Sequence, residues 1–250
     1  MNGCRITVLG SGNVFCEDGR AHASFLVEHE GGPRLLVDCG PTTLQGLRRH
    51  HIRLDSLDRV LITHFHGDHL GGLPLLALAS QLHPHEGGGR LRVVGPVGVA
   101  ERYRLLWQGM YPDLPGEEPL WQELPWTGGT VEVAGVQLVA VPMEHREESL
   151  GYRLEGSCRV GLSGDTCWGS SVVELARDLD LLLLDCTYVE PSPRAHLSLA
   201  ELRAHRQELA CPRVLLVHVH DAVARALAGS TLPGVEVAED GLIITVEGRC

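Results

Sequence analysis

A short apolar run that leads straight into a cluster of His and Asp constrains the fold of this chain more than any other feature. Residues 60–62 predict a buried strand. His64 and His66 follow two residues apart, so in an extended backbone both imidazoles point to the same side. A glycine then permits a tight turn before Asp68 and His69. Nitrogen and oxygen ligands in this arrangement suit one or two borderline divalent metals such as zinc or manganese.

This pattern, His64-x-His66-x-Asp68-His69 after an apolar strand, resembles the signature of the metallo-β-lactamase superfamily of hydrolases. It is similar to the motif of ribonuclease Z and related phosphodiesterases. A surface loop that is merely rich in His and Asp is the simpler alternative, but the preceding strand and the following glycines favour metal binding. The resemblance covers nearly the whole chain. It implies one domain over residues 1–250 with a four-layer α/β fold, an αββα sandwich of two mixed β-sheets packed face to face with helices outside.

The resemblance also implies which later residues complete the site. His145 follows a predicted strand at the place of the family's third histidine ligand. Residues 163–166 resemble the motif of the family's bridging aspartate, which here is Asp165. His218 matches the final histidine ligand. His220 is a rival for that position, because the two side chains would lie on the same face of one predicted strand.

Two divalent ions follow from this resemblance, with zinc favoured over manganese. The ligands of one ion would be His64, His66, His145 and Asp165. The ligands of the other would be Asp68, His69, Asp165 and His218. A water between the ions would lose its proton near neutral pH, since zinc-bound water has a pKa of about 7. The resulting hydroxide would be the nucleophile, and Asp68 would also orient it.

Asp38 and Thr63 are the expected supports of these ligands. Residues 34–37 predict a strand that ends in Asp38. In the family a matching Asp forms hydrogen bonds near the first histidines. Thr63 directly precedes His64, and we place it in the same supporting layer. An ordinary helix N-cap is the alternative role for Asp38, and the two roles are compatible.

His196 bears most on the choice of substrate. The segment His196-Leu197-Ser198 resembles the His-x-Ser/Thr loop of the phosphodiesterase branch, and its imidazole could protonate a leaving group. Only 165 − 145 = 20 residues separate His145 from Asp165, which leaves no room for the arm that grips tRNA in bacterial ribonuclease Z. The sequence therefore favours a small or cyclic phosphodiester as substrate, with Asp68 and His196 as catalytic residues.

Three other functions remain open at this stage. The first is hydrolysis of carboxyl, thio-, lactone or sulfate esters at the same metals, with His196 only structural. The others are tRNA 3′-processing and non-hydrolytic binding. The net charge of −11 disfavours extended contact with nucleic acid without excluding it. A homodimer is a further candidate assembly.

The remaining composition favours a cytoplasmic protein that does not bind membranes. No apolar run is long enough to span a bilayer, and the first residues lack the pattern of a signal peptide. Eight scattered cysteines without a Cys-x-x-Cys pair predict reduced, mostly buried thiols. Residues 110–130 predict a long irregular connection. His83 and His85 fall in a Gly-rich loop, where solvent exposure is favoured over metal binding.

Overall fold

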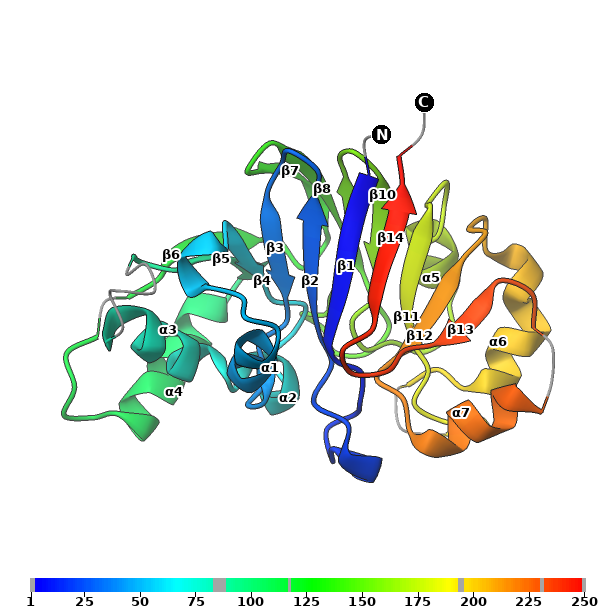
Figure 1. Cartoon of the computed structure of the whole chain (residues 1–250), viewed down its shortest axis with the longest axis horizontal. Helices are drawn as coiled ribbons and strands as arrows, with labels where there is room; N and C mark the ends of the chain where they lie inside the picture. The colour runs from blue at the N-terminus through cyan, green and yellow to red at the C-terminus, as the bar shows by residue number, and fades with distance from the viewer. Residues whose placement is uncertain (1–2, 83–88, 117, 193–195, 230–231, 249–250) are drawn as a thin grey trace.

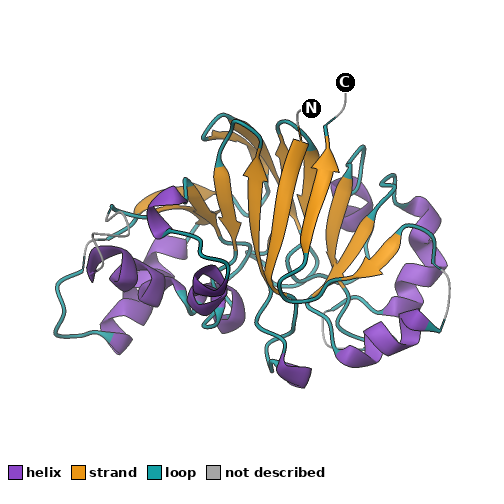
Figure 2. Cartoon of the chain, in the orientation of Figure 1, coloured by secondary structure: helices purple, strands orange, loops and turns teal. Residues whose placement is uncertain are grey.

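Two seven-stranded β-sheets pack face to face, and helices cover their outer faces (Figures 1 and 2). The computed structural model describes residues 3–82, 89–116, 118–192, 196–229 and 232–248. This arrangement confirms the αββα sandwich expected from the sequence. Among the described residues, no helix is both long and apolar enough to cross a membrane. His83 and His85 lie outside the described residues.

The first sheet combines parallel and antiparallel strands. Its order is β14 (Ile243–Glu247), β1 (Gly3–Gly10), β2 (Ser24–His29), β3 (Arg34–Val37), β4 (Arg59–Leu61), β5 (Arg92–Pro96) and β6 (Leu120–Leu124). Strands β3 to β6 are parallel to one another, and the rest pair antiparallel. The helices on its outer side are α1 (Thr43–Arg49), α2 (Gly67–Leu70), α3 (Leu73–Leu82) and α4 (Val99–Met110).

The second sheet repeats this mixed pattern. Its order is β13 (Val235–Val237), β12 (Val214–Val217), β11 (Leu181–Asp185), β10 (Arg159–Leu162), β9 (Leu150–Glu155), β8 (Val136–Pro142) and β7 (Gly129–Val133). Strands β10 to β13 are parallel, and β7 to β10 are antiparallel. Its outer helices are α5 (Ser170–Leu175), α6 (Leu199–His205) and α7 (Asp221–Ala228).

Strand β11 shows how the sequence builds these layers. Leu181 and Leu183 face the core between the sheets, whereas Leu182 and Leu184 face the helices, because successive side chains point to opposite sides. All four are fully buried. Burial of each contributes about 1.5–3 kcal/mol. The unbroken leucine run is therefore typical of a strand covered on both faces, and it holds Asp185 rigidly at its end.

The structure corrects one sequence prediction about secondary structure. Residues 110–130 are not irregular throughout, because β6 pairs with β5 at the edge of the first sheet. Its mostly exposed or half-buried residues obscure the alternation that reveals a strand. The Trp121 ring on β6 lies 5.2 Å from the Tyr103 ring and packs against the outer core, which anchors this edge strand.

The expectation of reduced thiols throughout is also wrong. Cys4 on β1 and Cys158 in the turn between β9 and β10 form a disulfide that joins the two sheets. They are 154 positions apart, so no local spacing signals the pair. The other described cysteines are free.

Candidate metal centre

The predicted site residues gather at the edge of the sandwich where the parallel strands end. Asp38 follows β3 and His64 lies beyond the end of β4, while Asp165 and His218 follow β10 and β12 in the other sheet. Carboxyl ends of parallel strands meet at one edge, so each sheet contributes a row of polar side chains. This edge lies opposite the N-terminus, since β1 and β3 run in the same direction (Figure 1).

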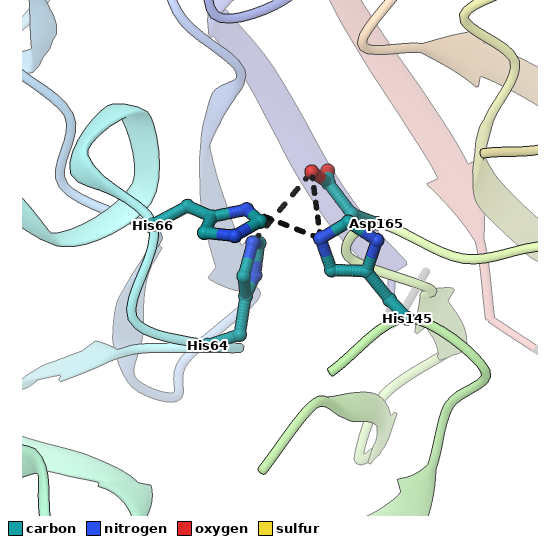
Figure 3. Close-up of side chains that lie close together, drawn as sticks. All are labelled: His64, His66, His145 and Asp165. Carbon is teal, nitrogen blue, oxygen red and sulfur yellow. Dashed lines mark hydrogen bonds and ion pairs between the residues drawn. The ribbon is translucent and has the colours of Figure 1, made fainter. Parts of the chain in front are cut away.

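The first cluster contains His64, His66, His145 and Asp165, whose ligand atoms all lie within 4.8 Å of one another. His145 Nε2 is 3.1 Å from His66 Nδ1. Asp165 Oδ2 is 3.6 Å from His64 Nε2 and 3.8 Å from His145 Nε2. Figure 3 shows the three imidazoles converging on one another and on the carboxylate.

The second cluster contains Asp68, His69, Asp165 and His218, again with ligand atoms within 4.8 Å. Asp165 Oδ1 is 3.2 Å from His69 Nε2 and 3.5 Å from His218 Nε2. Asp68 Oδ2 is 3.3 Å and 3.2 Å from the same two nitrogens. The two oxygens of Asp165 therefore face different clusters, which is the arrangement required of a bridging carboxylate.

Several ligand atoms of the two clusters have no hydrogen-bond partner in the described part of the chain and are therefore available to divalent cations. His64 Nε2, His69 Nε2 and Asp165 Oδ1 are buried with no hydrogen-bond partner among the described residues. An unsatisfied buried polar atom costs about 1–3 kcal/mol. A cation in each cluster would satisfy these atoms, and the carboxylates of Asp68 and Asp165 would offset part of the positive charge. The mixture of imidazole and carboxylate suits zinc and neighbouring metals.

The pKa shifts within the clusters also favour the binding of cations. Burial, and then the neighbouring His69, hold the pKa of His64 well below its ordinary value, so its nitrogen lone pair is available. Burial raises the pKa of Asp165, but the imidazoles of His218 and His69 outweigh it and keep the group ionised. Burial lowers the pKa of His69, but Asp165 and Asp38 outweigh it and raise that pKa well above the usual range. A proton and a metal ion therefore compete for this imidazole.

Asp38 and Thr63 lie directly behind the two clusters. Asp38 Oδ1 accepts the Thr63 backbone N–H at 2.8 Å, and Oδ2 accepts the Thr63 hydroxyl at 2.9 Å. His69 Nδ1 lies 2.7 Å from Asp38 Oδ2. Donation of this N–H to Asp38 leaves Nε2 directed at the second cluster. The alternative N-cap role is not observed, because Thr42 occupies the N-cap of α1.

Asp185 and Thr187 also support the centre, and neither residue was predicted from the sequence to do so. Asp185 is fully buried; it accepts the Thr166 backbone N–H at 3.0 Å and the Thr187 hydroxyl at 2.9 Å. Thr187 Oγ1 also lies 2.8 Å from His218 Nδ1. A carboxylate at the end of an unbroken apolar strand was the available signal.

His196 lies at the rim of the centre, with a side chain 16% exposed. Its Nδ1 is 2.9 Å from Asp185 Oδ2 and 3.9 Å from Asp165 Oδ2. Burial lowers the pKa of His196, but the hydrogen bond and charge of Asp185 outweigh it and raise the pKa to about 9. Its ring stacks on that of His218, with centroids 5.1 Å apart. The structure therefore places the His196 imidazole, with its raised pKa, beside both clusters.

The structure separates His218 from its rival His220. Strand β12 ends at Val217, and His218 has a left-handed backbone with φ of 55°. The two histidines therefore do not lie on one strand, contrary to expectation. His220 instead caps α7 by accepting the Ala222 N–H, and its Nε2 is 3.1 Å from Glu17.

A cavity of about 310 Å³ opens beside His196 and His218. Asn13, Phe15 and Tyr188 contribute to its wall. The Phe15 side chain is largely exposed, at 68%. This volume lies at the lower end of the range for small-molecule sites.

Comparison of the whole chain with known proteins decides its family. A family model described as Anti-Pycsar protein Apyc1 matches residues 4–231. The chain belongs to this family. Its Apyc1 relative from Bacillus phage 010DV004 is 29% identical over 240 residues, which cover 86% of this chain and 89% of the phage protein. Ribonuclease Z of Mycobacterium marinum is 33% identical over 187 residues, covering 68% and 66% of the two chains.

Solved structures show that this Apyc1-family chain has the metallo-β-lactamase fold, as the motif predicted. A diphosphatase from the PhnP family superposes with a TM-score of 0.77 at 25% identity, and all of both chains is covered. The metallo-β-lactamase fold protein YhfI from Bacillus subtilis gives 0.80 at 21% identity, with 98% and 100% covered. The chain is therefore a metallo-β-lactamase fold hydrolase with His/Asp clusters suited to metal ions.

Proposed function

We propose that this Apyc1-family protein hydrolyses small or cyclic phosphodiesters with two divalent ions, zinc favoured. The observation that carries the proposal is Asp165, whose two oxygens face two separate clusters of imidazoles. His64, His66 and His145 would hold one ion with Asp165. Asp68, His69 and His218 would hold the other. Such a pair of ions, when bound, supplies Lewis acidity that activates water and neutralises charge on the phosphoryl oxygens.

The chain's own residues supply orientation and a proton. Asp68 Oδ2 lies within 3.3 Å of the nitrogens of His69 and His218, so it would also orient the attacking water. Asp185 occupies His196 Nδ1, which leaves Nε2 as the nitrogen available to a substrate in the adjoining cavity. From there His196 would donate its proton to the leaving oxygen.

Three observations support a small substrate. The cavity beside His196 is about 310 Å³. The interval between His145 and Asp165 contains only a turn, β9 and β10, with no room for a tRNA-gripping arm. The net charge of −11 opposes extended contact with a polyanion. One structural neighbour is a diphosphatase from the PhnP family, which agrees with phosphorus as the electrophile.

Activity on matched substrates tests this proposal. The metal-loaded protein should cleave bis-p-nitrophenyl phosphate and an unactivated cyclic phosphodiester, and leave p-nitrophenyl esters, lactones and precursor tRNA nearly untouched. His196→Ala should lower kcat on the unactivated diester by about 10²–10⁴-fold, the usual contribution of a general acid. The loss should shrink for the p-nitrophenyl leaving group, which scarcely needs a proton.

The control is His205→Ala, which removes an imidazole that contacts Glu208 on the surface. It should retain parental kcat on both diesters. If His196→Ala matches the parent on the unactivated diester, the donor role is wrong. Preferential hydrolysis of lactones or carboxyl esters would replace the phosphodiesterase assignment.

A further inference from the structure

A third group of metal-binding side chains lies at the edge of the sandwich opposite the candidate metal centre. Cys4 is the second residue of β1 and pairs in register with His29 at the end of β2, while Cys158 lies in the turn before β10. Ligand atoms of these three residues lie within 4.8 Å of one another. Both sulfurs and the imidazole are buried, with residue exposures of 2%, 2% and 5%. None of these residues takes part in the proposed hydrolysis.

The donor atoms around Cys4 have the spacing of a tetrahedral metal site. Cys4 Sγ lies 3.3 Å from His29 Nδ1 and 3.6 Å from Ser157 Oγ. His29 Nδ1 and Ser157 Oγ are also 3.3 Å apart. Bonds of about 2.3 Å from zinc to sulfur and about 2.0–2.1 Å to nitrogen place tetrahedral ligands roughly 3.3–3.6 Å apart. Three edges of such a tetrahedron are therefore already present.

The hydroxyl of Ser157 is oriented for the remaining corner. It donates to the Gly3 carbonyl at 2.7 Å, so its lone pairs, rather than its proton, face the sulfur and the imidazole. The fourth donor is Cys158, whose sulfur is bonded to that of Cys4 in the oxidised form. Separation of the two sulfurs on reduction would complete the set.

We propose that in the reduced protein Cys4, Cys158 and His29 bind a zinc-type divalent cation, with the Ser157 hydroxyl at the fourth corner, and that the disulfide is the oxidised, metal-free form of the same site. Two thiolates balance the charge of the cation, which makes the site neutral and suits its burial. Oxidation by a small-molecule disulfide RSSR transfers two electrons. The thiolates become the Cys4–Cys158 disulfide, RSSR becomes two RS⁻ thiolates, and the cation leaves.

The site would link the sheets in either redox state. Cys4 and His29 belong to the first sheet, whereas Ser157 and Cys158 belong to the turn of the second. The bond that joins the layers changes from sulfur–sulfur to sulfur–metal–sulfur. This is the geometry of a structural zinc site, closed by four protein ligands with no open position.

Cobalt substitution tests the proposal without any assay of hydrolysis. Metal-free protein is reduced with a phosphine under argon and titrated with Co²⁺. The reduced parent should take up one equivalent more than the oxidised parent, and it should show sulfur-to-cobalt charge-transfer absorption in the near ultraviolet. The candidate centre contains no thiolate, so it cannot produce this absorption.

Variants assign the absorption to residues. Cys4→Ser and Cys158→Ser should each abolish it, and His29→Gln should weaken Co²⁺ binding by at least about tenfold, the lower end of what even the outer partners of ligands contribute. Cys16→Ser is the matched control, because Cys16 Sγ lies 3.2 Å from His22 Nε2 and forms the other Cys–His contact described here. It should retain the absorption.

Equal cobalt uptake by the oxidised and reduced parent, without charge transfer, would overturn the proposal and leave the pair as a disulfide only. Survival of the absorption in Cys4→Ser or Cys158→Ser would overturn it as well. The comparison of the two parent forms needs no variant to fold. Neither outcome depends on whether the protein cleaves phosphodiesters.

Discussion

Histidine residues in the candidate centre are oriented by oxygen atoms on the side away from the clusters. Asp38 holds Nδ1 of His69, Asp185 holds Nδ1 of His196, and Thr187 lies beside Nδ1 of His218. In each ring the contact at Nδ1 leaves Nε2 for the cluster or the cavity. Such partners fix the tautomer and direction of an imidazole before a ligand arrives.

The choice between His218 and His220 gives a prediction at this scale. His218→Ala should lower metal affinity by more than about 100-fold, because even the outer partners of ligands contribute about 10–100-fold. His220→Ala should leave metal content unchanged. It loses the cap on the Ala222 N–H and a partly exposed contact with Glu17, and neither contact involves a residue of the two clusters. Elemental analysis measures the metal content of both variants. Loss of metal in His220→Ala but not in His218→Ala would assign the ligand to His220 instead.

Residues could be predicted from the sequence where one motif holds them together. The segment from His64 to His69 can be recognised because four metal-binding side chains, three His and one Asp, occur within six positions after a strand. The later ligands could be identified only from their order along the chain; they are His145, Asp165 and His218. Asp185 and Thr187 escaped notice because their partner His218 lies 31 positions beyond Thr187, a pairing that no local spacing encodes.

The ends of the strands determine where the site residues lie at the edge of the sandwich. The order of the strands within each sheet could not be predicted from the sequence alone. Strands β13 and β14 follow one another in the chain, but β13 joins the second sheet and β14 the first. A hydrophobic pattern reports which face of a strand is buried, and it does not report the neighbouring strand. Strand β6 was not predicted because it lies at the edge of its sheet, where most of its residues are exposed or half-buried and the apolar alternation is weak.

Strand β11 offers a test of this role. Leu183→Ala removes a fully buried side chain two residues before Asp185 and should lower the free energy of unfolding by about 2–5 kcal/mol. Leu105→Ala is the matched control, since Leu105 on α4 is 57% exposed, and it should change stability by no more than about 0.5 kcal/mol. Urea denaturation measures both. Equal losses would show that β11 is not a rigid support.

Across the whole molecule, the candidate centre joins the two sheets. Asp68 and His69 follow the first sheet's β4, and Asp165 and His218 follow strands of the second. Cations bound between them should therefore stabilise the packing of sheet against sheet. A ligand that binds only the folded state at 100 times its Kd adds about 2.7 kcal/mol.

Metal removal should therefore lower thermal stability. Oxidised protein treated with a chelator should unfold at a lower Tm than the metal-loaded protein in calorimetry, and added zinc should restore the Tm. Asp165→Ala, which lacks the shared carboxylate, should respond little to the chelator. An unchanged Tm in the parent would mean that the clusters do not bridge the sheets through bound ions.

The pairing of β1 with β14 also has a consequence for biosynthesis. The register joins Gly3 to Glu247, so nearly the full length of the chain separates two neighbouring strands. A ribosome releases β1 long before β14, and until then the backbone edge of β1 stays open to other chains. Contacts this distant slow folding, because a long loop must close first. Nascent chains of this protein therefore depend on protection of that edge until the last strand arrives.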